Sequence, residues 1–206
     1  MVMRVFWRPS VVSWLALAAA AGVTAACSGL RNEARYGTAS PRVVDPTQPI
    51  PKGGGTYKLG APYQIDGRWY VPQEGSGYDR TGLASYYAED FHGRRTSNGE
   101  IFDMWALTAA HPTLPLPSLA YVTNLENGRT LLLRLNDRGP YVNNRMIDLS
   151  RASARYLGVE GPGLARVRVR YAGPAPLSGD DRREQRFLAS QPWFQIRLAR
   201  GPNDSR

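Results

Sequence analysis

Side chains that could do chemistry gather in four polar, turn-rich segments of the sequence. These segments are residues 91–104, 107–112, 136–141 and 145–150. Asp137 stands at the end of an apolar run, so a strand could hold its carboxyl group rigidly. A carboxyl group held in this way suits general acid–base catalysis.

Each candidate residue also has an ordinary structural interpretation. Asp137 could cap the turn that the Asp-Arg-Gly-Pro sequence forces. His111 lies among apolar residues, where a lone histidine is more often a hydrogen-bonded core residue than a catalytic one. Glu100 follows an Asn-Gly pair, which is common in turns. Taken singly, none of these residues specifies a function.

Hydrophobic patterns predict the strands that would position these segments. Residues 63–70 favour two short strands around Asp66-Gly67, a strong hairpin signal. Residues 120–124 and 130–135 form the clearest strand pair, joined around an Asn-Gly turn. Residues 164–171 alternate between apolar side chains and arginines, which predicts a half-buried strand. The arginine row could bind a polyanion, but a plain solvated face is the favoured interpretation.

One helix is expected between Ser150 as its N-cap and Gly158 as its end. These elements predict a small, mainly β domain over about residues 79–171, built as a barrel or a sandwich. We expect the aromatic hairpin, residues 63–78, to pack on the edge of this domain. Its rings could alternatively stack on sugars.

Composition excludes several kinds of site. One cysteine cannot form an internal disulfide or a cysteine-based zinc site, and two histidines leave little room for a histidine-rich metal centre. We therefore expect no metal site of these kinds, and the chemistry implied by the family resemblance described below requires no metal and no organic cofactor. The formal charge is +9, but only two of the 26 basic residues, Lys52 and Lys58, are lysines. A lysine-rich nucleic-acid arm is absent from the sequence, and we expect no nucleic-acid partner.

The N-terminus has the pattern of an export signal. Two arginines precede an apolar run over residues 11–26, which is shorter than the ~20 residues that a membrane-spanning helix needs. Small residues immediately before Cys27 resemble the bacterial lipobox, although Thr24 stands where Leu or Val is commoner. We expect residues 1–26 to be removed and Cys27 to be lipidated. Ordinary cleavage would instead release a soluble protein.

The expected domain is flanked by two irregular segments. Residues 27–62, rich in proline and glycine, predict a flexible tether. Residues 172–206 predict a tail or a strand-like addition, because they are too few for an independent domain.

Several short motifs occur in a fixed order over the predicted domain. They lie at residues 82–87, 91–96, 98–100, 107–111, 122–125, 136–140 and 147–150. Together they resemble the rare lipoprotein A family of septal-ring lytic transglycosylases. The resemblance implies a six-stranded double-psi β-barrel with one or two short helices. It also implies cleavage of the MurNAc–GlcNAc bond of peptidoglycan with formation of 1,6-anhydro-MurNAc ends.

This chain departs from the family pattern in three places. Tyr86 stands where the family usually has tryptophan, and alanine instead of glycine follows Tyr87. Many members also carry a C-terminal SPOR domain, whereas residues 172–206 predict none. Targeting to septal glycan through such a domain is therefore not expected here.

The resemblance also implies roles for individual residues. Asp137 is the expected catalytic acid and base, with a pKa raised by burial or by a nearby charge. Glu100 could supply that charge or bind the sugar, and His111 could orient Asp137. Substrate binding is expected of Asp103, Arg138 and Asp148. Asp148 is also the rival acid, since it resembles a carboxylate of expansins, or it could cap the following helix.

The same resemblance implies where the protein works and with what. The expected partners are peptidoglycan glycan strands, a membrane reached through the lipid on Cys27, and division-site proteins. Ser28 after the cysteine favours the periplasmic face of the outer membrane over retention in the inner membrane. The alternative function is a non-catalytic, expansin-like lipoprotein that binds the wall.

Overall fold

The computed structural model describes residues 40–87, 89–142 and 144–200. The expected signal peptide and Cys27 lie outside these residues. The described strands are β1 (Tyr63–Ile65), β2 (Arg68–Tyr70), β3 (Asp79–Tyr86), β4 (Thr108–Ala110), β5 (Ser118–Asn124), β6 (Thr130–Asp137), β7 (Arg145–Leu149) and β8 (Ala165–Pro174). The described helices are the short 3₁₀ helix η1 (Glu89–Phe91), α2 (Arg151–Leu157), α3 (Arg182–Ala189) and α4 (Pro192–Arg200).

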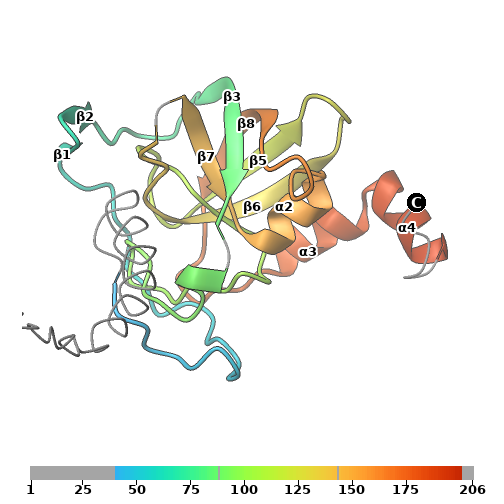
Figure 1. Cartoon of the computed structure of the whole chain (residues 1–206), viewed down its shortest axis with the longest axis horizontal. Coiled ribbons are helices and arrows are strands. Elements are labelled where there is room, and N and C mark those ends of the chain that lie inside the picture. The colour runs from blue at the N-terminus through green and yellow to red at the C-terminus, as the bar shows by residue number, and fades with distance from the viewer. Residues whose placement is uncertain (1–39, 88, 143, 201–206) are drawn as a thin grey trace, which may run out of the picture.

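Six of the strands close into a barrel in the order β3, β7, β4, β6, β5 and β8 (Figure 1). The pairs β3–β7 and β4–β6 are parallel, and the other four pairs are antiparallel. Parallel neighbours cannot be joined by a tight hairpin, so the chain must cross over the barrel to make them. The prediction of a mainly β, six-stranded double-psi barrel is confirmed, although α3 and α4 exceed the one or two short helices expected.

The core explains the run of leucines in the first half of β6. Leu131, Leu133 and Leu135 are fully buried in the main core of the barrel. Leu132 points to the other side, where it packs with Leu119 and a partly buried ring of α3. Because both faces of this part of β6 are covered, residues 131–133 are consecutive leucines instead of alternating with polar residues.

Local sequence signals placed several elements correctly. Asp66 and Gly67 both adopt positive φ, 48° and 78°, as a tight turn between β1 and β2 requires. Ser150 caps α2 by accepting the backbone N–H of Ser153, and Gly158 ends the helix in a left-handed conformation. Along β8 the arginines at 166, 168 and 170 are exposed and the residues between them are buried, as the alternation predicted.

Residues 40–62, hereafter the strap, differ from the flexible tether expected there. The strap lies along the barrel, held by backbone hydrogen bonds from Val43 to Gly93 and from Thr56 to Asn98, both 2.9 Å long. Lys58 makes a further two-way backbone bridge to Leu116. Proline and glycine prevent regular secondary structure, but they leave an extended chain free to pair with loop backbones.

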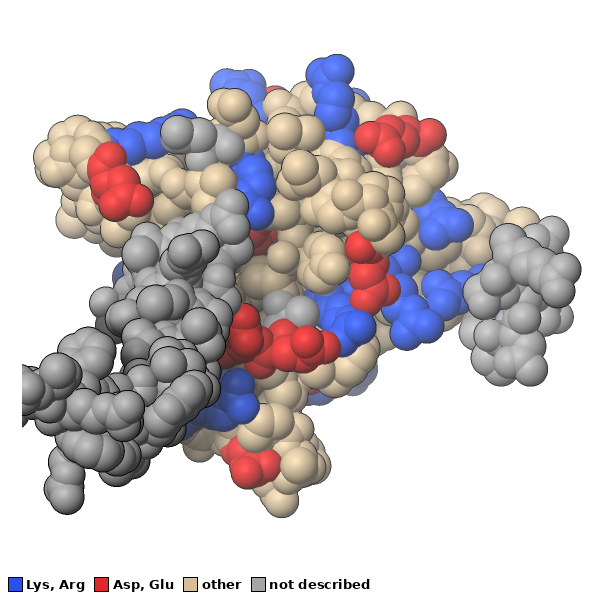
Figure 2. Space-filling view, in the orientation of Figure 1, with Lys and Arg blue, Asp and Glu red and all other residues tan. Residues whose placement is uncertain are grey.

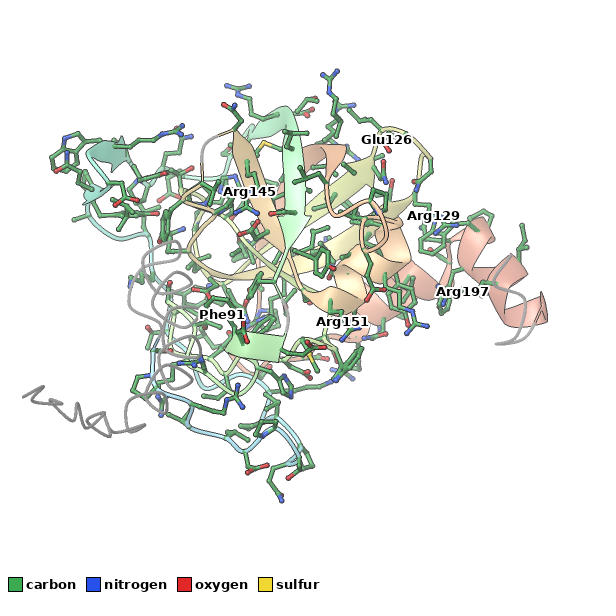
Figure 3. All side chains as sticks on the ribbon, in the orientation of Figure 1. Phe91, Glu126, Arg129, Arg145, Arg151 and Arg197 are labelled. Atoms are coloured by element: carbon green, nitrogen blue, oxygen red, sulfur yellow. The ribbon has the colours of Figure 1, made fainter. Side chains whose placement is uncertain are left out.

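The C-terminal segment is helical where a tail or a strand-like addition was expected. α3 buries Leu188 against the main core and also buries Glu184, whereas its three arginines are exposed. Beyond α3, Arg129 lies over the Trp193 ring at 5.2 Å, and Arg197 of α4 lies over the Tyr156 ring at 5.8 Å (Figure 3). Trp193 and Phe194 of α4 pack against the main core, and Phe194 meets Tyr156 of α2 edge-on.

Among the described helices, none is long and apolar enough to cross a membrane. Figure 2 shows basic side chains along the upper edge of the molecule and toward α3 and α4, with acidic side chains interspersed.

Candidate functional site

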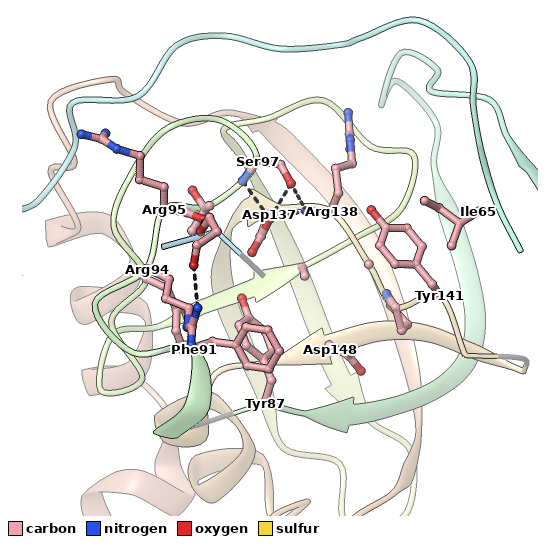
Figure 4. Close-up of a pocket in the computed structure, with 16 residues that line it drawn as sticks. Ile65, Tyr87, Phe91, Arg94, Arg95, Ser97, Asp137, Arg138, Tyr141 and Asp148 are labelled. Carbon is pink, nitrogen blue, oxygen red and sulfur yellow. Dashed lines mark hydrogen bonds between the residues drawn. The ribbon is translucent and has the colours of Figure 1, made fainter. Parts of the chain in front are cut away.

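A cavity of about 420 Å³ opens near the ends of β3, β4, β6 and β7 (Figure 4). Asp137 and Asp148 both line this cavity, as do Tyr87 and Ala110. Carboxyl groups held at strand ends are well placed for chemistry, because the rigid barrel fixes their positions. Two of the sequence-predicted residues, which lie on separate strands, thus share one cavity.

Ala110 sets the spacing of the two carboxyl groups. It pairs with Asp137 on one neighbouring strand and with Asp148 on the other. The two aspartates are therefore two strand spacings apart, roughly 10 Å between their Cα atoms. Directly paired residues project to the same side of a sheet, so the small Ala110 methyl leaves open space between the carboxyl groups.

Asp137 has one oxygen fully engaged and one open. Its Oδ1 accepts the backbone N–H of Ser97 at 2.8 Å, the Ser97 hydroxyl at 2.6 Å and the backbone N–H of Arg138 at 2.8 Å. Its Oδ2 accepts no hydrogen bond from the described residues and faces the cavity (Figure 4). Burial raises the pKa of Asp137, and the bonds from Ser97 and Arg138 only partly oppose this rise. The raised pKa favours the protonated form of this carboxyl group, and a proton on it belongs on Oδ2, because Oδ1 accepts three hydrogen bonds.

Asp148 is a second buried carboxyl group with a raised pKa. Its side chain accepts the Ser85 hydroxyl through Oδ1, and Arg145 donates to the same Ser85 hydroxyl at 2.6 Å (Figure 3). The Arg145 guanidinium lies 3.8 Å from Asp148, too far for a direct hydrogen bond. Burial raises the pKa of Asp148 despite these neighbours. The helix cap considered for Asp148 is supplied by Ser150 instead.

Glu100 does not join these carboxyl groups. It is buried at 4% exposure and lines a second, smaller cavity of about 50 Å³. Arg134 binds both of its oxygens, and Asn98 and Asn136 each donate to it at 3.0 Å. Burial alone would raise the pKa of Glu100, but these hydrogen bonds together lower it. The expectation that Glu100 supplies negative charge beside Asp137 is wrong, because that charge is neutralised by Arg134.

Glu100 instead supports the loop that holds Asp137. The Asn98 side chain donates to Glu100 and accepts the Thr96 hydroxyl at 2.8 Å. Ser97 lies between Thr96 and Asn98 in the sequence, and it makes two of the three hydrogen bonds to Asp137 Oδ1. Glu100 therefore acts on Asp137 through the conformation of Ser97.

His111 is a core residue, as the ordinary interpretation allowed. It is 1% exposed, and its Nδ1 accepts the backbone N–H groups of Thr113 and Leu114. The ring proton therefore lies on Nε2, which is 2.9 Å from the Tyr78 hydroxyl. Burial, followed by the charge of Arg138, lowers the pKa of His111 to about 3. Its imidazole does not orient the Asp137 side chain; only the His111 backbone N–H, bonded to the Asp137 carbonyl at 3.0 Å, reaches that residue.

Of the other expected binding residues, Arg138 lines the main cavity and Asp103 does not. The Arg138 guanidinium donates to the backbone carbonyls of Leu59, His111 and Leu114, so it ties the strap to the barrel. Asp103 lines the second cavity and accepts the backbone N–H of Trp105 at 2.9 Å. In the structure, both side chains therefore hold backbone segments in place.

The hairpin places its exposed tryptophan away from the cavity. Tyr63 pairs with Tyr70 and Ile65 pairs with Arg68, so these residues share one face of the hairpin. Ile65 lines the cavity, and Tyr63 donates to the Pro112 carbonyl at 2.6 Å. Trp69 occupies the opposite face and is 63% exposed.

Comparison with known proteins identifies the barrel. Residues 79–169 match the family model described as "Lytic transglycolase". The chain is 42% identical over 145 residues to the endolytic peptidoglycan transglycosylase RlpA of Pseudomonas aeruginosa (strain UCBPP-PA14), covering 70% of this chain and 42% of that protein. The barrel belongs to the RlpA family. The RlpA of Helicobacter pylori (strain J99 / ATCC 700824) is 48% identical over 111 residues, covering 52% of this chain and 35% of that protein.

This RlpA-family chain spans less than two thirds of the length of those relatives. Among solved structures, it is similar to the Streptomyces papain inhibitor, with a TM-score of 0.39 and 23% identity over 47% of this chain and 96% of that one. In the described part of the RlpA-family chain, no three His, Cys, Asp or Glu side chains come together in a group that could hold a metal ion.

The barrel also brings residues to the two carboxyl groups that the sequence motifs did not mark. Ser97, Ser85, Arg145 and Ala110 act on the two carboxyl groups through contacts between distant strands and loops. Ser97 carried a weak signal, since it lies in a family motif region between Thr96 and Asn98. Nothing local marked Ala110, because its role depends on its two partner strands.

Proposed function

We propose that this chain is a lytic transglycosylase that cleaves the MurNAc–GlcNAc bond of peptidoglycan and leaves 1,6-anhydro-MurNAc ends. One observation carries the proposal: Asp137 has one oxygen held by three donors and the other open to a cavity, with a raised pKa. The names of the relatives support the choice of substrate and reaction.

A single carboxyl group of this kind suffices for the reaction. Asp137 gives its Oδ2 proton to the bridging oxygen as the bond from that oxygen to C1 of MurNAc breaks. The Asp137 carboxylate then accepts the proton of the C6 hydroxyl while the oxygen of that hydroxyl bonds to C1. Atoms and charges balance without water, whereas a hydrolase needs a second carboxyl group for a water or a covalent intermediate.

Ser97 and Arg138 perform the positioning in this scheme. Their three donors keep the proton off Oδ1 and fix the direction in which Oδ2 points. The same donors stabilise the carboxylate that remains after proton transfer. Burial raises the pKa of Asp137 and so favours the protonated form before the reaction, which lets one residue serve as acid and then as base.

Asp148 is the second carboxyl group on the cavity and the rival acid. Its Oδ1 is taken by Ser85, and the residue is 6% exposed. If Asp148 acted with Asp137 through a water molecule, the products would carry reducing ends. Wild-type protein incubated with isolated sacculi should release 1,6-anhydro ends detectable by mass spectrometry. Reducing ends would indicate a hydrolase, and binding without products would indicate the expansin-like alternative.

We also propose that Cys27 is acylated and anchors the protein at the periplasmic face of the outer membrane, where it acts in daughter-cell separation with division-site proteins. The sequence around Cys27 supports this. Cells expressing the full chain should incorporate labelled palmitate into the wild type and not into Cys27→Ala. Equal labelling of the two proteins, or no labelling of the wild type, would contradict the anchor.

A further inference from the structure

The hydroxyl of Tyr87 is buried in the wall of the main cavity without a hydrogen-bond partner among the described residues. Leaving a buried hydroxyl unpaired costs stability, so such groups are rare and call for an explanation. Phenylalanine would fill the same space without this cost. The position therefore carries a polar atom that the folded protein does not itself use.

The ring of Tyr87 is held rigidly. It stacks on Phe102 with centroids 4.3 Å apart and planes 25° from parallel, and it meets Phe91 edge-on at 5.7 Å. Its backbone N–H donates to the carbonyl of Leu149 at 3.0 Å, next to Asp148 in β7. The hydroxyl consequently has a fixed direction, which a substrate-binding group requires.

That direction leads toward the two carboxyl groups. Figure 4 shows the Tyr87 ring below Asp137 and to the left of Asp148, with its hydroxyl end toward Asp137. Burial, together with the charges of Asp137 and Asp148, raises the pKa of Tyr87 well above its ordinary value. The raised pKa favours the protonated phenol, which is therefore available as a neutral hydrogen-bond donor.

We propose that Tyr87 is a substrate-binding residue that donates its hydroxyl to a sugar hydroxyl shared with Asp137. A sugar hydroxyl that gives its proton to a carboxylate keeps its lone pairs free, and one of them accepts from Tyr87. In the reaction proposed above, on which this inference rests, that sugar group is the C6 hydroxyl of MurNAc. Tyr87 would hold its oxygen beside C1 while Asp137 removes its proton.

Tyr87→Phe separates this role from a structural one. The variant keeps the stacked ring and removes only the unpartnered hydroxyl, so the melting temperature should stay the same or rise. Release of 1,6-anhydro products from sacculi should fall by roughly tenfold or more, the effect of losing one hydrogen bond in the reacting complex. The matched control is Tyr86→Phe, because Tyr86 is adjacent, packs against the core and does not line the cavity.

Both proteins are tested as full chains beside the wild type. Wild-type product release by Tyr87→Phe would overturn the inference, and so would a loss of release accompanied by a large fall in melting temperature. If the wild type itself releases no anhydro products, the proposed function fails separately. Affinity for sacculi then decides: Tyr87→Phe must bind more weakly than Tyr86→Phe, and equal affinities would overturn the role of the hydroxyl.

Discussion

Ser97 donates both its backbone N–H and its hydroxyl to the same oxygen of Asp137, Oδ1, at 2.8 and 2.6 Å. The two bonds leave Oδ2 as the only oxygen of this carboxyl group open to the cavity. They also lower the pKa of Asp137, against the larger effect of burial. Ser97 therefore fixes both where the proton lies and how readily it leaves.

Ser97→Ala should move the pH profile of product release to higher pH. Removing the hydroxyl takes away a bond that favours the carboxylate, so the pKa of Asp137 rises further. Since the acid must be protonated when the reaction begins, the alkaline limb of the kcat/KM profile moves to higher pH. The profile is measured by mass spectrometry of anhydro ends. Ser178→Ala, at an exposed loop position, should leave the limb in place, and a downward shift in Ser97→Ala would contradict this account.

Glu100→Gln should destabilise the fold by about 3–5 kcal/mol, the usual cost of removing one partner from a buried ion pair. The substitution leaves the Arg134 charge buried without its carboxylate. The pKa of Glu100 is lower in the folded protein than in the unfolded chain. The ion pair therefore stabilises the fold fully at pH values above the ordinary pKa of glutamate, and this stabilisation is lost as the pH falls through the folded pKa. Urea unfolding measures the difference in free energy of unfolding between the wild type and Glu100→Gln. This difference should be large at pH 7 and should shrink at acid pH.

An exposed ion pair provides the control for Glu100. Lys52 lies 2.8 Å from Asp181 with its side chain 65% exposed, and Lys52→Ala should cost only about 0–1 kcal/mol. If the two variants were destabilised equally, the buried pair would not be the feature that holds the loop of residues 96–100.

Ala110→Val should impair catalysis while leaving both carboxyl groups in place. The added methyl groups occupy the space between Asp137 and Asp148, which Ala110 keeps open. Overpacking of this buried site should lower the free energy of unfolding by about 1–3 kcal/mol. Product release should fall by more than the decrease in the folded fraction accounts for. Ala189→Val at the exposed end of α3 is the control for adding a β-branched residue. Full activity in Ala110→Val would show that the open space is not the substrate site.

Gly55→Ala tests whether the strap supports the site. A Cβ at Gly55 would lie 2.8 Å from Asn98 Nδ2 and 2.8 Å from Glu100 Cγ, so either the strap or the loop must move. We expect lower activity and a lower melting temperature. Gly161→Ala is the matched control, because nothing lies within 4 Å of its added methyl group. Equal behaviour of the two alanine variants would mean that the strap does not brace the loop.

The sequence predicted the elements whose causes are local. The Asp66-Gly67 turn, the Ser150 cap and the alternation along β8 depend on neighbouring residues and appeared where expected. β4 was missed because it is three residues long and exists through its pairing with β6 and β7. The partnership of Glu100 with Arg134 joins residues 34 positions apart, and no local pattern signals it.

The candidate site was predicted in part for the same reason. The motif around Asp137 marked that residue, but its three donors come from Ser97 and Arg138, and Ser97 is 40 residues away. Glu100 and His111 belong to the same motifs, and their positions in the fold make them supports of the Asp137 backbone and loop. Sequence motifs mark residues that a site needs without separating those that touch substrate from those that hold the site together.

Asp137 is the acid of the proposed reaction, and Asp137→Asn tests this role most directly. The variant keeps the size of the side chain and the acceptor at Oδ1 but cannot give or take the proton. Incubated with isolated sacculi, the wild type should release 1,6-anhydro-MurNAc products, and Asp137→Asn should bind the sacculi and release none. Release by Asp137→Asn at the wild-type rate, above all if Asp148→Asn releases none, would contradict the account and assign the acid to Asp148.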